Sequence, residues 1–283
     1  MKAEVVPGAG LRPEMELTPN RIHPTALLST EAELAPDVAV GAFAIVEGKV
    51  RLGSGCVIRP RAHLIGPLTM GKDNQVYSNA VIGERPQHLH YRDEPTGVEI
   101  GDGNTFRENL TVHRGTAATG LTRIGDGNFF MAGSHVAHDC RVGNRCTLVN
   151  NALLGGHCQL ADFAYVSGNA AVHQFCRMGR LSFMGGGSIT TKDVPPFVMQ
   201  QGVNSVVGIN VVGMRRAGLA EEQINSLRQV YHVVFLRGLS LPNALTRVEQ
   251  ELGHVDVVRE FVTFVRQSQR GINRARGRGS SAT

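Results

Sequence analysis

An apolar residue recurs at every sixth position, and no other feature of the 283-residue chain restricts its fold as strongly. The pattern starts at Ile22 and continues without a break through ten further residues: Leu28, Leu34, Val40, Val46, Leu52, Ile58, Leu64, Met70, Val76 and Ile82. It fails at His88 and Glu94 and resumes in the same phase from Ile100 to Met184. A period of six fits neither an amphipathic helix nor an alternating strand. It predicts a left-handed parallel β-helix of hexapeptide repeats, in which three hexads form one triangular coil.

Two columns of small residues support this fold. Glycine often follows the repeated apolar residue, as at Gly53 and Gly155, where a side chain would crowd the corner of the coil. Four positions after each apolar residue, between residues 134 and 188, every residue is small: Ser134, Cys140, Cys146, Ala152, Cys158, Ala164, Ala170, Cys176, Ser182 and Ser188. The remaining cysteine, Cys56, falls in the same column. We therefore interpret all the cysteines as small core residues in a reducing compartment, not as zinc ligands.

The repeat ends near Lys192-Asp193, because the two prolines that follow cannot continue a strand ladder. Apolar residues then take helical spacing over 219–237, and further helices are expected over 242–252 and 255–270. We therefore divide the chain into four parts. These are an N-terminal extension (1–21), the β-helix (22–195), a small α-helical C-terminal domain (196–270) and a basic tail, expected to be disordered (271–283).

The composition restricts the possible partners. The net charge is +5, and five arginines without any acidic residue in 261–283 account for it, so we expect a solvated basic end. Nucleic-acid binding is not expected, because the chain has no Trp and only four Tyr to stack on bases. No signal peptide or membrane segment is visible, which predicts a cytoplasmic protein. Flat prism faces and a triangular section predict a homotrimer.

Histidines concentrate on about three adjacent coils of the predicted β-helix. Four of them lie in this region: His135, His138, His157 and His173. Residues three hexads apart stack, which places Asp139 over His157, and His138 over Gly156 and Gln174. Several imidazoles beside one carboxylate can ligate a metal or act as a general base. We favour a base that Asp139 orients, because imidazole titrates near neutral pH, and we expect no metal and no other cofactor.

Gly155-Gly156 supplies bare backbone N–H groups next to His157, and such groups can bind an oxyanion. The sequence contains no nucleophile elbow, P-loop or dinucleotide-binding glycine motif. A base and an oxyanion donor are sufficient for direct acyl transfer to a hydroxyl or an amine, without a covalent enzyme intermediate. The residues therefore favour acyl transfer.

Two segments interrupt the repeat and are expected to project from the prism as loops. They cover residues 83–99 and 114–123. The first contains His88, His90 and Arg92, which suit an anionic, partly aromatic ligand such as a nucleotide. The alternative is a surface excursion that only packs against a neighbour.

Several motifs together resemble the acyl-[acyl-carrier-protein]–UDP-N-acetylglucosamine O-acyltransferase family. The match runs from His23 to the helical domain and is carried by GERPQ (83–87), HRGT (113–116), HVAHDCRVGNRC (135–146), NNALLGGH (150–157), AVHQF (171–175), DVPPF (193–197) and GIN…GMRR (208–216). The resemblance implies a homotrimer that moves a 3-hydroxyacyl chain from acyl carrier protein to the 3-hydroxyl of UDP-N-acetylglucosamine. This reaction is the first step of lipid A biosynthesis.

The resemblance also assigns roles to individual residues. His138 is the general base, Asp139 its orienting partner, and the N–H of Gly156 the oxyanion donor. Gly186 matches the position that limits acyl length, and a small residue there suggests that a long chain fits. The substrate-binding positions are Gln87, Leu89, His90, His135, His157, His173, Gln174, Asn210 and Arg216. Leu89 and Asn210 match nucleotide contacts, and Arg216 matches a phosphate contact.

The chain departs from the family pattern at two basic positions. His90 stands where the family commonly has a Lys beside the nucleotide phosphates, and Arg216 is followed by Ala217 where the family often has another Arg. A neutral imidazole is a weaker and more pH-dependent phosphate partner than an ammonium group. The identity of the nucleotide sugar therefore stays open.

Three alternatives remain at this stage. The same base and oxyanion donor serve N-acylation of a 3-amino-3-deoxy nucleotide sugar. A catalytically weak paralogue could bind the nucleotide sugar or the carrier protein without turnover. A β-helix metalloenzyme of the carbonic anhydrase kind would hold zinc on histidine side chains.

Overall fold

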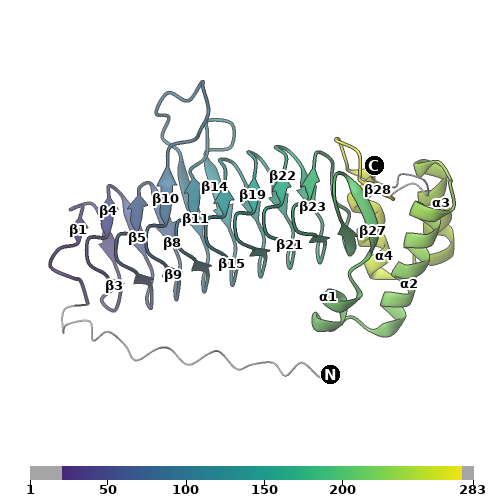
Figure 1. Cartoon of the computed structure of the whole chain (residues 1–283), viewed down its shortest axis with the longest axis horizontal. Helices are drawn as coiled ribbons and strands as arrows, with labels where there is room; N and C mark the ends of the chain where they lie inside the picture. The colour runs from purple at the N-terminus through teal and green to yellow at the C-terminus, as the bar shows by residue number, and fades with distance from the viewer. Residues whose placement is uncertain (1–20, 276–283) are drawn as a thin grey trace.

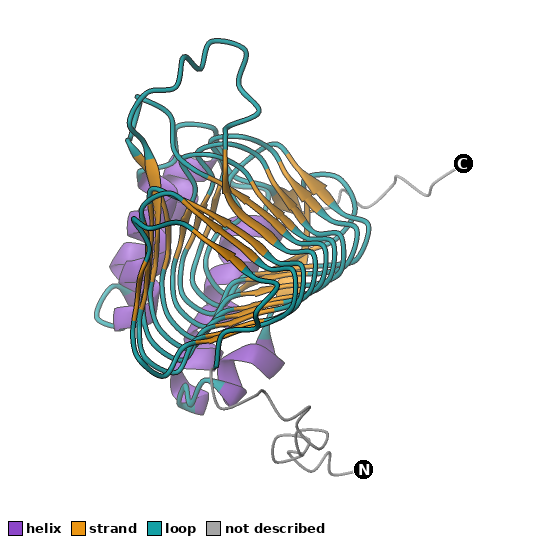
Figure 2. Ribbon diagram, turned by 90° about the vertical axis from the view of Figure 1, so that its left-hand side faces the viewer, coloured by secondary structure: helices purple, strands orange, loops and turns teal. Residues whose placement is uncertain are grey.

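The computed structural model describes residues 21–275, and its main body is a three-sided β-helix with helices at the C-terminal end (Figure 1). Figure 2 shows the triangular section of the stacked coils. The prediction of a hexapeptide β-helix followed by a helical domain is confirmed. Residues 1–20 of the predicted extension, and 276–283 of the predicted tail, lie outside the described residues.

Three sheets form the sides of the prism. The first sheet contains β1 (Leu27–Leu28), β4 (Ile45–Glu47), β7 (His63–Ile65), β10 (Val81–Glu84), β13 (Thr111–His113), β16 (His135–Val136), β19 (Leu153–Leu154), β22 (Ala171–Val172) and β25 (Ile189–Thr190). The second contains β2 (Glu33–Leu34), β5 (Val50–Leu52), β8 (Leu68–Met70), β11 (Gly97–Ile100), β14 (Leu121–Ile124), β17 (Arg141–Val142), β20 (Gln159–Leu160) and β23 (Arg177–Met178). The third contains β3 (Ala39–Val40), β6 (Val57–Ile58), β9 (Gln75–Val76), β12 (Thr105–Phe106), β15 (Phe129–Phe130), β18 (Thr147–Leu148), β21 (Tyr165–Val166), β24 (Phe183–Met184), β26 (Val198–Gln200), β27 (Ser205–Ile209) and β28 (Arg274–Ala275).

Parallel pairing keeps the coils in register. An ordinary coil pairs Ile45 with His63, 18 residues further on. The two interrupted coils are longer, because Val81 pairs with Thr111 and Thr111 pairs with His135. The loops thus add twelve and six residues, both whole hexads, and this is why the apolar phase resumes unchanged after them. The rule that residues three hexads apart stack does not hold for these two coils.

The interior is built from the two predicted columns. The repeated apolar residues from Val40 onward are buried, except Ala118, which lies in the added hexad of the second interrupted coil and is exposed. All ten members of the small column and all five cysteines, which are unpaired, are buried as well. The glycines that follow the apolar residues allow the coils to approach closely. A Cβ atom at Gly53 would lie 2.6 Å from the carbonyl carbon of Gly71 in the next coil, well inside van der Waals contact.

The C-terminal domain differs in detail from its prediction. Its first residues form β26 and β27, which extend the third sheet, before α1 (Val211–Arg216) begins. Then come α2 (Glu221–Tyr231), a π-helical turn (His232–Leu236), α3 (Leu241–Leu252) and α4 (Asp256–Arg266). Within residues 21–275, none of the helices is long and apolar enough to cross a membrane.

The start of the predicted tail is folded. Gly271 accepts a hydrogen bond from the Asp193 N–H, Asn273 donates one back to the Asp193 carbonyl, and β28 pairs with β27. Ile272 and Asn273 are buried. The last coil would otherwise leave unpaired backbone groups, so this segment covers an open end of the β-helix. The ordered chain therefore extends past the predicted boundary at residue 270.

Replacing Gly53 with Ala tests the close approach of the coils. We expect Gly53→Ala to destabilise the protein by about 1–3 kcal/mol, because the methyl group overlaps the backbone of Gly71. Gly208→Ala is the matched control, since nothing lies within 4 Å of an added Cβ there. Thermal unfolding at equal protein concentration measures both, and equal melting temperatures for the two variants would contradict this account of the coil packing.

Candidate active site

Two loops and three stacked corners share one edge of the prism. The long loop (85–96) joins β10 to β11, and the short loop (114–120) joins β13 to β14. The corners 137–140, 155–158 and 173–176 also connect the first sheet to the second. We call this edge the loop edge, and in Figure 1 the long loop projects from it. Both loops are shorter than predicted, because their flanking residues continue the strands.

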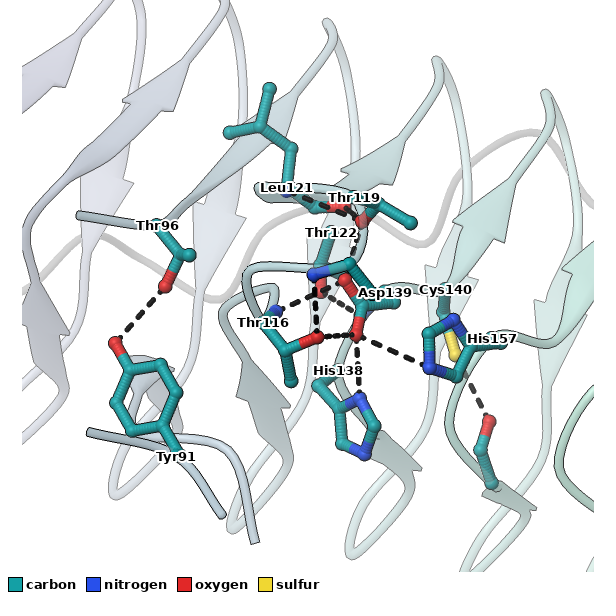
Figure 3. Close-up of polar contacts among 12 residues, drawn as sticks. Tyr91, Thr96, Thr116, Thr119, Leu121, Thr122, His138, Asp139, Cys140 and His157 are labelled. Atoms are coloured by element: carbon teal, nitrogen blue, oxygen red, sulfur yellow. Dashed lines mark hydrogen bonds and ion pairs between the residues drawn. The ribbon is translucent and has the colours of Figure 1, made fainter. Parts of the chain in front are cut away.

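The Asp139 carboxylate accepts four hydrogen bonds at the loop edge. The residue is 3% exposed, and its backbone takes the left-handed conformation, with φ of 60°. Oδ1 accepts hydrogen bonds from the Thr116 N–H (3.0 Å) and from the Thr119 hydroxyl. Oδ2 accepts them from the Thr116 hydroxyl (2.8 Å) and from His138 Nδ1 (2.7 Å) (Figure 3). The four donors occupy the lone pairs of an ionised carboxylate.

The electrostatics of Asp139 follow from these bonds. Burial alone would raise the pKa of the carboxyl, but the hydrogen bonds from His138, Thr119 and Thr116 outweigh it and hold the pKa well below its ordinary value. Asp139 is therefore a permanent anion at neutral pH. An anion can only accept, so His138 Nδ1 carries the proton, and its Nε2 is left as the basic nitrogen of the neutral ring.

His157 stacks on the next coil and completes this group. Its Nε2 lies 3.5 Å from Asp139 Oδ2, and its ring makes a T-shaped contact with His138 at 5.2 Å between centroids. The other side of the ring stacks on Phe175, with centroids 4.4 Å apart. Burial, opposed by the charge of Asp139, lowers the pKa of His157 and favours the neutral imidazole.

Gly156 lies directly against the ring of His138. A Cβ atom there would be 2.6 Å from Cε1 and 2.8 Å from Nε2 of His138, so only glycine leaves this nitrogen accessible. Within residues 21–275 the N–H of Gly156 has no hydrogen-bond partner, as is usual for the second residue of these corners. A basic nitrogen and an unpaired N–H donor thus lie side by side.

Two further histidines join this group, and the sequence reasoning did not place either of them beside His135 and His138. The ring centroid of His88, on the long loop, lies 5.4 Å from that of His138. The ring centroid of His113, at the end of β13, lies 4.9 Å from that of His135. The Nδ1 atom of His135 is 2.7 Å from the Thr111 hydroxyl. His113 could have been found by counting the added hexad of the short loop. No sequence pattern sets the position of His88, because a projecting loop has no register.

The other predicted positions divide into two groups. Gln87, Leu89 and His90 are exposed on the long loop, and His173 and Gln174 are exposed at the corner beyond His157. These five lie on the loop edge with His138. The ring centroids of His90 and His88 lie 5.8 Å apart. The Nδ1 atom of His173 lies 3.4 Å from Nη2 of Arg270.

Three predicted positions lie elsewhere on this chain. Gly186 is at the corner between the third and first sheets. Asn210 caps α1, where its Oδ1 accepts from the Gly213 N–H and its Nδ2 donates to the Leu181 carbonyl, both at 2.9 Å. Arg216 is in the last turn of α1. The fold of one chain does not bring these residues to His138.

The geometry bears on the choice between a metal and a base. One potential ligand atom from each of His138, Asp139 and His157 lies within 4.8 Å of the others, so a metal site is conceivable from distances alone. The Asp139 oxygens, however, are already saturated by four donors, and a cation would have to displace them. The arrangement fits an oriented base better than a metal centre.

A separate cleft of about 790 Å³ lies on the second sheet, beside both loops. It is lined by strand and loop residues that include Glu33, Arg51, Glu99 and Leu121, and it contains no histidine. Its size alone does not make it the site, because the converging imidazoles, the carboxylate and the free N–H all lie on the loop edge.

The buried imidazoles predict that stability falls in mild acid. Burial lowers the pKa of His135 to about 4, from 6.5. The unfolded chain therefore binds more protons between these values, and the free energy of unfolding decreases as pH falls through this window. At pH 5 the loss is about 2 kcal/mol relative to pH 7.5. Urea unfolding at both pH values measures it.

His135→Gln is the control, because an amide can still bond to Thr111 but does not titrate. This variant should lose about 2 kcal/mol less stability than the wild type between pH 7.5 and pH 5. Equal acid sensitivity of the two proteins would mean that His135 is not responsible.

Comparisons with known proteins identify the family of the chain. Residues 193–273 match the family described as UDP N-acetylglucosamine O-acyltransferase, domain 2, and residues 121–156 match the bacterial transferase hexapeptide family. Proteins from Halorhodospira halophila and Anaeromyxobacter, both named acyl-[acyl-carrier-protein]–UDP-N-acetylglucosamine O-acyltransferase, are 46% and 47% identical. These alignments cover 90% and 89% of this chain and 99% of each relative.

Solved structures give the same result. The UDP-N-acetylglucosamine acyltransferase of Francisella novicida superimposes with a TM-score of 0.87 at 33% identity, over 89% of this chain and 94% of that chain. The enzyme of the same name from Bacteroides fragilis superimposes with a TM-score of 0.86 at 36% identity, over 89% and 99%. Sequence and structure agree over nearly the whole described chain, and the protein therefore belongs to the acyl-[acyl-carrier-protein]–UDP-N-acetylglucosamine O-acyltransferase family.

Proposed function

We propose that this protein transfers an acyl chain from acyl carrier protein to UDP-N-acetylglucosamine. The observation that carries the proposal is the 2.7 Å hydrogen bond from His138 Nδ1 to Asp139, with the free N–H of Gly156 beside the same ring. The family to which the chain belongs supplies the substrate class. The 3-hydroxyacyl donor, the 3-hydroxyl acceptor and the place at the first step of lipid A biosynthesis follow from the sequence resemblance.

The reaction proceeds by direct attack. His138 Nε2 takes the proton of the acceptor hydroxyl as its oxygen forms a bond to the thioester carbonyl carbon. Asp139 stabilises the imidazolium that results, and the Gly156 N–H donates to the oxyanion of the tetrahedral intermediate. The intermediate collapses by breaking the carbon–sulfur bond, and the imidazolium returns its proton to the departing thiolate. Every proton and electron pair is accounted for by the two substrates and one imidazole.

The loop edge supports a defined placement of the substrates. Gln87, Leu89 and His90 are exposed on the long loop, whose His88 ring contacts that of His138, and His173 and Gln174 are exposed at the corner one coil beyond that of His157. Leu89 is 92% exposed, so that its whole side chain is available for contact with a ligand. We infer that the nucleotide sugar lies between these two groups, with its reacting hydroxyl at His138.

We also propose that the protein is a homotrimer. The outward side chains Leu27, Leu153 and Ile189 of the first sheet are exposed and apolar, which suits a subunit interface. Gly186, Asn210 and Arg216 lie away from the base of their own chain, so their assigned roles require that a neighbouring copy bring them to it. A cytoplasmic location stays a prediction.

Replacing the base tests the proposed activity. We expect His138→Ala to lower kcat by 10²- to 10⁴-fold, because proton removal from the hydroxyl is no longer assisted. The measurement is turnover of 3-hydroxyacyl carrier protein with UDP-N-acetylglucosamine. His254→Ala, at an exposed histidine of the helical domain, is the control and should retain full activity. Unchanged turnover by the His138 variant would exclude its role as base.

The same assay separates the remaining alternatives. Run with the 3-amino-3-deoxy acceptor in competition, it distinguishes O-acylation from N-acylation, and we expect the hydroxyl sugar to be used. Turnover of the amino sugar alone would keep the mechanism and change the substrate. No turnover of either acceptor by the wild type would favour a binding paralogue, and loss of activity on chelation would favour the metalloenzyme.

The assembly is tested by mass. Size-exclusion chromatography with light scattering should give about 92 kDa, three times the 30.5 kDa chain. A mass near that of one chain in an active preparation would contradict the proposed trimer.

A further inference from the structure

The short loop supplies most of the hydrogen bonds that hold Asp139. Thr116 donates through its backbone N–H and its hydroxyl, and Thr119 donates through its hydroxyl. Thr122, just after the loop, accepts from the Asp139 N–H at 2.9 Å. Figure 3 shows the three threonines converging on this one residue. The extra hexad of this coil therefore has an identifiable use beside the base.

Thr116 and Thr119 differ in how they are built into the fold. Thr116 is buried, and its carbonyl accepts from the N–H groups of Thr119 and Gly120, so it also shapes the loop. Thr119 is exposed and reaches the carboxylate with its hydroxyl alone. That hydroxyl also lies 3.0 Å from the Leu121 carbonyl. A hydroxyl has one proton, and the charged carboxylate is the stronger acceptor.

The bond from Thr119 matters because Asp139 has two imidazoles within reach. His138 Nδ1 lies 2.7 Å from Oδ2, and His157 Nε2 lies 3.5 Å from the same oxygen. Thr119 and the Thr116 N–H hold Oδ1 on the loop side, which prevents the carboxylate from rotating about its own axis. If Oδ1 loses one of these donors, Oδ2 can move from His138 toward His157.

We propose that Thr119 is a positioning residue, whose hydroxyl anchors Asp139 Oδ1 so that Oδ2 stays on His138 Nδ1 and not on His157. This inference rests on the proposed function, since it concerns the orientation of the same base. The short loop then serves the chemistry through its hydrogen bonds to Asp139.

The test uses substitutions that isolate the hydroxyl in the full-length protein. Thr119→Val keeps the shape of the side chain and removes the donor, and Thr119→Ser keeps the donor. Thr69→Val changes an exposed threonine of β8 that makes no side-chain hydrogen bond within residues 21–275, and it serves as the control. We expect Thr119→Val to lower kcat about tenfold with KM for both substrates unchanged. Thr119→Ser and Thr69→Val should stay within about twofold of the wild type.

A double-mutant cycle separates positioning from a general structural effect. In an Asp139→Asn background, Thr119→Val should cost nothing further in kcat, because the anchored carboxylate is already gone. The proposal is overturned if the tenfold cost persists in that background, if KM rises with kcat unchanged, or if Thr119→Ser is as impaired as Thr119→Val.

Proton NMR of the protein without substrates tests the role of Thr119 independently of the proposed function. The proton on His138 Nδ1 should give a downfield ¹H resonance, identified by its loss in His138→Ala. We expect the resonance to be retained in Thr119→Ser and shifted upfield or lost in Thr119→Val. If the wild type turned over neither acceptor, the proposed function would fail while this result still decided the role of Thr119. An unchanged resonance in Thr119→Val would overturn the positioning role.

Discussion

In-register stacking of the coils is the constraint on which the rest of the structure depends. Each coil donates backbone N–H groups to the carbonyls of the next, and a slip of one residue would turn the apolar side chains outward. Both loops add their extra residues at a corner and in whole hexads, so that Ile100 pairs with Met70 and Ile124 with Ile100 in unbroken phase. The ladder of β10 and β13 absorbs a bulge between Ile82 and Glu84 without losing this phase. The interruptions are therefore additions to the repeat and not defects in it.

The corners convert this regular stacking into a functional edge. Asp139, His157 and Phe175 take left-handed backbone at successive corners, with φ of 60°, 61° and 64°. Such a conformation costs a non-glycine residue about 1 kcal/mol or more, and the ladder on either side maintains it. The result is a row of three stacked side chains along one edge of a rigid prism. The adjacent loops add donors from Thr116 and Thr119 on one side and the ring of His88 on the other.

How far the site could be predicted depended on whether a residue lay in the repeat. The stacking of Asp139 over His157 follows from counting three hexads, and the structure confirms it, as it does for the buried cysteine column. The position of His88 does not follow, because a projecting loop has no register. The ordered segment at residues 271–275 was missed because its basic composition suggested a solvated end, whereas Ile272 and Asn273 cover the last coil. The basic composition of the whole tail did not predict this, because burial depends on the two individual residues that pack on the last coil.

The sequence by itself determined the period, and with it the three-sided β-helix, the inward columns and the corner to which each residue of the repeat belongs. The physical reason is that each hexad occupies an equivalent position in the stacked coils. The six-residue pattern along the chain is therefore sufficient to predict the fold of the whole repeat. Only the tertiary structure decided which donors meet Asp139 and which rings surround His138. Those contacts join the short loop, the long loop and two coils through residues that are 18 to 50 positions apart in the chain. The six-residue pattern predicts where the loops interrupt the repeat but not the conformation in which each loop packs against the loop edge.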